Sequence, residues 1–150
     1  MGEEKKFNFV YERRTDEDNE FIKSFKIYGE YHYIDITRFS TKWAVDREKD
    51  MYLIYNDVPN ALINEGVKGG TFINFIYKNQ VCWIEYEEHY DWNIKVEYIK
   101  FLKVEIPKNL ADEKEYLFEA IKEAIRVKFE EDGYNVKCVF LNEIEKIYYI

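Results

Sequence analysis

The chain has little of the chemistry from which most small active sites are built. It contains two histidines and two cysteines among 150 residues, and it has no Gly-x-Ser-x-Gly, Cys-x-x-Cys or His-Glu-x-x-His motif. His32 precedes Asp35 by three residues, which places the two side chains on opposite faces of a strand and gives no local pair for base catalysis. The sequence therefore favours a protein that is not an enzyme. The alternative is a small metal- or carboxylate-dependent enzyme centred on His89 or His32. A third hypothesis is a subunit that self-associates through the aromatic face of its sheet.

Long apolar runs are also missing. No segment approaches the roughly 18 uninterrupted apolar residues of a membrane-spanning helix, and residues 1–6 lack the apolar core of a signal peptide. Cys82 and Cys138 each lie in an apolar, strand-like run, which is typical of buried free thiols in a cytoplasmic protein. A single disulfide between neighbouring strands is the other interpretation of this pair. We therefore expect a cytoplasmic protein that does not enter a membrane.

Basic residues are outnumbered by acidic ones. The chain has 22 Lys and Arg against 30 Asp and Glu, a net charge of -8. Such a surface repels phosphate backbones, so direct nucleic-acid binding is disfavoured. It would steer a basic protein toward the chain, although solubility alone explains the same excess. No cofactor is expected, because the glycine-rich run at residues 66–71 separates Lys68 from Thr71 by two glycines and leads into a strand, unlike a phosphate-binding loop.

Aromatic residues are abundant: 14 Tyr, 11 Phe and 3 Trp make up 19% of the chain. They suit the half-buried face of a β-sheet. The stretch from Gly69 to Pro107 shows the pattern best, because apolar residues alternate with charged ones over residues 94–106, the period of a half-buried strand. We expect three antiparallel strands here, with one dry face.

One clear helix follows these strands. Apolar residues recur at steps of three and four over residues 112–132, which predicts an amphipathic helix. Further strands are expected at residues 7–11, 31–39, 43–45, 51–55 and 134–141. Residues 15–28 fit either a short capped helix or a strand, and the strand is preferred because Ser24 does not continue a helical stripe. The element type at residues 144–150 is left open.

The fold class that follows is α+β. We predict one globular domain over residues 1–150, built as an antiparallel meander of about six to eight strands with the main helix packed on one face. The strand order and the oligomeric state do not follow from the sequence.

The best candidate for a functional surface is a short acidic and aromatic segment. It consists of Glu85, Tyr86, Glu87, Glu88, His89, Tyr90, Asp91 and Trp92. If the rings point outward, aromatic anchors surrounded by charge have the composition of a protein-binding hot spot. If the rings point into the core and the acids face water, the segment is only a solvated turn. Three acids of the helix, Glu119, Glu123 and Glu130, would extend the negative surface if the helix packs nearby.

His89 lies among these carboxylates, but the segment matches no known metal-ligand spacing, so no metal site is predicted. The function expected from the sequence is therefore non-enzymatic protein binding. The acidic, aromatic surface would sequester a basic partner, as an inhibitor, an antitoxin or an immunity protein for a toxin or nuclease does.

Overall fold

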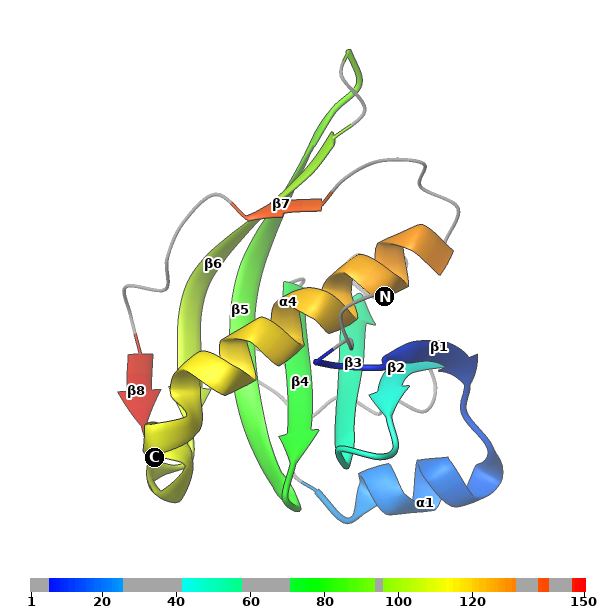
Figure 1. Ribbon diagram of the computed structural model, residues 1–150, viewed down its shortest axis with the longest axis vertical. Helices are drawn as coiled ribbons and strands as arrows, with labels where there is room; N and C mark the ends of the chain where they lie inside the picture. The colour runs from blue at the N-terminus through cyan, green and yellow to red at the C-terminus, as the bar shows by residue number, and fades with distance from the viewer. Residues whose placement is uncertain (1–5, 26–41, 58–70, 94–95, 132–137, 141–146) are drawn as a thin grey trace, which may run out of the picture.

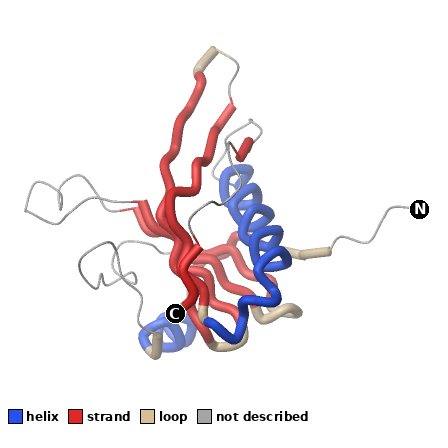
Figure 2. Tube along the Cα trace, turned by 90° about the vertical axis from the view of Figure 1, so that its left-hand side faces the viewer, coloured by secondary structure: helices blue, strands red, loops and turns tan. Residues whose placement is uncertain are grey.

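The computed structural model describes residues 6–25, 42–57, 71–93, 96–131, 138–140 and 147–150. These residues form one eight-stranded sheet with a helix on each face (Figures 1 and 2). In chain order the elements are β1 (Val10–Arg13), α1 (Asp16–Lys23), β2 (Lys42–Asp46), β3 (Met51–Asp57), β4 (Thr71–Tyr77), β5 (Gln80–Asp91), β6 (Val96–Ile106), the 3-10 helix η1 (Lys108–Glu113), α4 (Lys114–Glu131), β7 (Cys138–Phe140) and β8 (Ile147–Tyr149).

The sheet is a meander. Strands β1 to β6 lie in sequence order and each pairs antiparallel with the next, whereas β7 and β8 both pair parallel with β6. The predicted α+β fold, with an antiparallel meander and one main helix on a face, is therefore confirmed. The expected first strand begins later than residue 7, at Val10, and the expected hairpin over residues 43–55 is formed by β2 and β3.

The turn between β4 and β5 is a tight one. Tyr77 pairs with Gln80, and the two residues between them, Lys78 and Asn79, have φ angles of 51° and 59°. Positive φ at both central positions defines a type I′ turn, whose twist matches that of the flanking strands. This turn fixes the register of β4 against β5.

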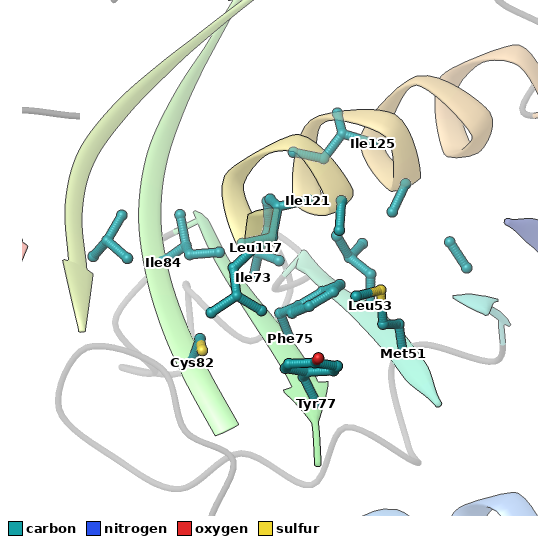
Figure 3. Close-up of a cluster of buried hydrophobic side chains, with 14 of the residues drawn as sticks. Met51, Leu53, Ile73, Phe75, Tyr77, Cys82, Ile84, Leu117, Ile121 and Ile125 are labelled. Carbon is teal, nitrogen blue, oxygen red and sulfur yellow. The ribbon is translucent and has the colours of Figure 1, made fainter. Parts of the chain in front are cut away.

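The main core lies between the sheet and α4 (Figure 3). The predicted helix over residues 112–132 is confirmed, with its first turn formed as η1 and the α-helix running from Lys114 to Glu131. Its buried stripe consists of Leu117, Ala120, Ile121, Ala124, Ile125 and Phe129. These side chains meet Leu53, Ile73 and Phe75 from β3 and β4, all of which are 1% exposed or less. Burial of this apolar stripe, rather than helix propensity, holds α4 in place.

A second, smaller core lies on the opposite face, beneath α1. Ile22 of the helix packs there with Trp43, Val45, Ile54, Ile76 and Val81. The preference for a strand at residues 15–28 is wrong for the part that is described. Thr15 Oγ1 accepts from the Asp18 N–H at 3.2 Å, and the Asp18 carboxylate accepts from the Thr15 N–H at 2.8 Å. This reciprocal capping box starts a helix, and Phe21, Ile22 and Phe25 supply its apolar face.

Strand β6 departs from the single alternation expected over residues 94–106. Glu85 pairs with Lys103, but the next residue, Tyr86, pairs with Phe101. Leu102 is therefore the extra residue of a β-bulge, and the buried side of the strand changes there. Ile99 and Phe101 are buried before the bulge, and Val104 and Ile106 are buried after it.

Some expectations fall outside the described residues. They include the strand over residues 31–39, the end of the predicted helix at residue 132 and most of the strand over residues 134–141. Cys82 is a free buried thiol, so the disulfide interpretation is wrong. The terminal element that was left open contains β8, and the backbone of Ile150 bonds to that of Ile106 and Lys108, each at 2.9 Å.

Candidate functional site

The acidic aromatic segment forms the outer half of β5, which pairs with β6 as a projecting arm. In Figures 1 and 2 the end of this arm extends well beyond β1 to β4 and beyond α4, and β7 pairs with β6 along residues 97–99. The pairing continues to its end, since Asp91 is opposite Val96. The predicted binding segment thus lies on a projecting hairpin rather than on the broad face of the sheet.

The aromatic residues of the segment are divided between the core and the surface. Tyr86 is 1% exposed and belongs to the core beneath α4, so it is not part of an outward-facing anchor. Trp92 is 79% exposed at the end of the arm. Glu85 and Asp91 are half-buried, and the side chains of residues 87–90 are outside the description. Among the described side chains of the segment, Trp92 is therefore the aromatic ring that is exposed to solvent.

The turn at the end of the arm is held by a local hydrogen bond. The Asn93 backbone N–H donates to Asp91 Oδ1 at 2.9 Å. An aspartate that accepts from the backbone two residues later forms an Asx-turn, which fixes the chain direction over the residue between them. Trp92 is that residue, so its backbone position is set by the carboxylate beside it.

The arm is less negative than the acidic segment by itself, because β6 contributes lysines that lie opposite acids of β5. Lys103 lies opposite Glu85, and Lys100 lies opposite Glu87. Between residues 85 and 103 the chain has five acids and three lysines. Opposite charges on facing positions favour the pairing of the two strands. The arm is thus mildly acidic, with two of its carboxylates opposite lysines.

The acids of α4 that were expected to extend this surface are partly neutralised by neighbouring cations. Glu119 forms an ion pair with Lys6 at 2.5 Å, and Glu123 forms one with Arg126 at 3.4 Å. Glu130 is exposed near the end of the helix. Two of the three carboxylates therefore have a cation beside them.

The described residues show no arrangement of side chains that supports an enzyme centred on His89 or His32. His89 lies on β5 opposite Tyr98, but its side chain is outside the description, and so is all of His32. Within the described ranges, no three His, Cys, Asp or Glu side chains gather as metal ligands would. None of the described helices is long and apolar enough to cross a membrane.

Asn74 is a buried polar residue that the sequence analysis does not single out. Asn74 of β4 is 0% exposed, and within the described part of the chain neither its amide nitrogen nor its carbonyl oxygen has a hydrogen-bond partner. Its neighbours in the register are Ile54 and Trp83, on the face that carries the smaller core. The signal was available, because Asn74 is the one amide inside the apolar run from Phe72 to Ile76.

A polar network ties the turn between β4 and β5 to η1. The Tyr77 hydroxyl and the Lys78 ammonium both donate to Glu113, at 3.0 Å each. The hydrogen bond from Lys78 holds the pKa of Glu113 below its ordinary value, with Tyr77 adding to the effect. Burial, followed by the bond to Glu113, raises the pKa of Tyr77. Reciprocal bonds of 2.7 Å between the side-chain amides of Gln80 and Asn109 fasten the same junction.

The buried thiol of Cys82 does not have the character of a reactive nucleophile. Burial raises the pKa of Cys82 to about 12, so the thiol stays protonated at neutral pH. Comparison with known proteins adds no assignment: no family model, no curated protein and no solved structure matches the chain.

Proposed function

We propose that this chain is a non-enzymatic protein-binding module and that its β5–β6 arm contacts a basic protein partner. The observation that supports this proposal most is the 79% exposure of Trp92 at the end of the arm. A large, exposed aromatic ring is costly to leave in water, and tryptophan is among the residues that contribute most to binding at protein interfaces.

The surroundings of Trp92 suit a partner that carries positive charge. Asp91 adjoins the ring, and the arm has more carboxylates than lysines. The whole chain has a net charge of -8, which accelerates the approach of a cationic protein and disfavours acidic ones. The charge selects the partner, and the ring anchors it.

The base of the sheet gives the arm a fixed platform. Strands β5 and β6 continue from a core covered by α4, and the Asx-turn holds the chain around Trp92. An anchor that is already ordered loses little conformational entropy on binding. This design fits a cytoplasmic inhibitor, antitoxin or immunity protein that masks a toxin or nuclease with a basic surface.

The experiment is affinity capture from the source cell followed by measurement of binding to the captured basic protein. The test variant is Glu87→Gln with Glu88→Gln. Neutralisation is preferable to reversal, because a lysine at position 87 would lie opposite Lys100 and set like charges across the strands. The matched control is Glu48→Gln with Asp50→Asn, two exposed acids in the turn between β2 and β3.

We expect the arm variant to associate with the partner several-fold more slowly and with a weaker dependence on salt, while the control binds as the wild type does. The melting temperatures of all three proteins should agree closely. Equal binding by the arm variant, or the absence of any basic protein among the captured ones, would contradict the proposal.

A further inference from the structure

A shallow hollow lies at the end of β5 opposite to the arm tip. It has a volume of about 310 Å³ and is lined by Gln80, Val81, Trp83, Pro107 and Ile150, a set of residues that we call the Trp83 hollow. Most of the lining is apolar, and Ile150 is 49% exposed at its rim. An open apolar depression of this kind accepts a protruding side chain better than a flat surface does.

We propose that the Trp83 hollow receives Trp92 from a second copy of this chain. Trp92 is the most exposed large apolar side chain of the described residues, and it follows Asp91, the last residue of β5, at the tip of the arm. The hollow and the ring are thus complementary in shape and in polarity, one concave and apolar and the other convex and apolar.

The occupant must come from another molecule. Strand β5 has twelve residues, with the hollow at its first residues and the arm at its last. At about 3.3 Å per residue the two ends lie roughly 36 Å apart, too far for Trp92 to reach the hollow of its own chain. Two copies placed side by side in opposite directions bring each tip to the other's hollow. The contact then occurs twice, as a closed two-fold dimer requires.

Local charges favour the same pairing. The tip carries Asp91 next to Trp92, whereas the hollow is followed by the exposed Lys108. The Lys108 backbone N–H donates to the Ile150 carbonyl at 2.9 Å, which places this residue at the rim. A carboxylate beside the ring therefore meets an ammonium beside the hollow, and this attraction orients the two copies against the repulsion between their net charges.

The inference does not depend on the proposed function, but it uses the same side chain. A second copy and a basic partner would compete for Trp92, so self-association would bury this side chain until the partner displaces the second copy. Failure of the dimer leaves partner capture to be judged by its own experiment, and failure of capture leaves the dimer intact.

The test is sedimentation equilibrium over a series of protein concentrations. We expect the wild type to show a monomer–dimer equilibrium, and Trp92→Ala and Ile150→Asp each to weaken it at least about tenfold. The second change leaves the backbone bonds of Ile150 in place. Val10→Ala, at another exposed apolar residue (56%) on β1, is the matched control and should dimerise as the wild type does.

Mixing the two disruptive variants sharpens the test. A heterodimer of Trp92→Ala with Ile150→Asp retains one of the two contacts, since one copy supplies an intact ring and the other an intact hollow. The mixture should therefore associate more tightly than either variant alone. A wild type that stays monomeric at every concentration, or dimerisation that survives Trp92→Ala, would overturn the proposal. Melting temperatures that agree with the wild type at concentrations where all of the proteins are monomeric exclude misfolding as the cause of any loss.

Discussion

The base of the sheet and the β5–β6 arm are built on different principles, although the same two strands run through both. In the base, Phe75 and Ile73 are 0% exposed beneath α4, and Ile54 and Ile76 are 1% exposed or less beneath α1. At the arm tip, Trp92 is 79% exposed. The comparison shows that one part of the chain supplies the stability and the other presents a side chain to solvent.

The arm depends on the base for its order. A two-stranded hairpin is at best marginally stable alone in water. Here the strands are continuous with the packed sheet, β7 pairs with residues 97–99 of β6, and Tyr86 and Phe101 anchor the root of the arm in the core. The exposed tip can therefore change in sequence with little effect on folding.

The largest effect is expected in the base. Phe75→Ala removes a fully buried ring at the centre of the α4-facing core and should lower the free energy of unfolding by about 3–5 kcal/mol. The control is Val10→Ala on the exposed edge strand, which should change it by less than about 0.5 kcal/mol. Denaturant unfolding measures both. Similar values for the two variants would show that the core is not where stability resides.

A substitution at Asn74 is expected to have a smaller effect on the free energy of unfolding, and of the opposite sign. Its amide is buried without a partner, and a buried unpaired polar group costs roughly 1–3 kcal/mol. Asn74→Leu should therefore raise the free energy of unfolding by about 1 kcal/mol, while Asn74→Asp, which buries a charge, should lower it. A destabilised leucine variant would mean that the amide has a role in the fold that its neighbours do not reveal.

A still smaller effect concerns the junction of β4, β5 and η1. The pKa of Glu113 lies below its ordinary value of 4.5, chiefly through the bond from Lys78. The stabilisation is therefore complete above pH 4.5 and is lost as the pH falls through the lowered pKa of the folded state. Glu113→Gln should be less stable than the wild type at neutral pH, and the difference should vanish in acid. Glu115→Gln, at an exposed position on α4, should show no such trend, and a pH-independent difference at Glu113 would exclude this mechanism.

Much of the base could be predicted from local patterns, whereas its exceptions depend on distant contacts. The stripe on α4 and the hairpin of β2 and β3 follow from spacing alone. The capping box at Thr15 and Asp18 was visible in the sequence, but the strand was preferred over it. The bulge at Leu102 was not visible, because it depends on the register between β5 and β6.

The candidate site was predictable only in part. The burial of Tyr86 follows from the alternation that also buries Cys82 and Ile84 on β5, once the strand is known to be continuous. The exposure of Trp92 depends on how far β5 and β6 extend beyond their neighbours, and composition does not encode that length. The balance of charge on the arm likewise required the register that places Lys100 opposite Glu87.

The most direct test of the division between base and arm is to measure stability and partner binding on one variant, Trp92→Ala. At a protein concentration at which the wild type is monomeric, we predict a free energy of unfolding within about 0.5 kcal/mol of the wild type. We also predict at least a tenfold loss of affinity for the captured basic protein, or about 1.4 kcal/mol. Tyr149→Ala, at an exposed ring on β8, should change neither quantity. Unchanged affinity for Trp92→Ala, or a loss of stability comparable to that of Phe75→Ala, would contradict the account.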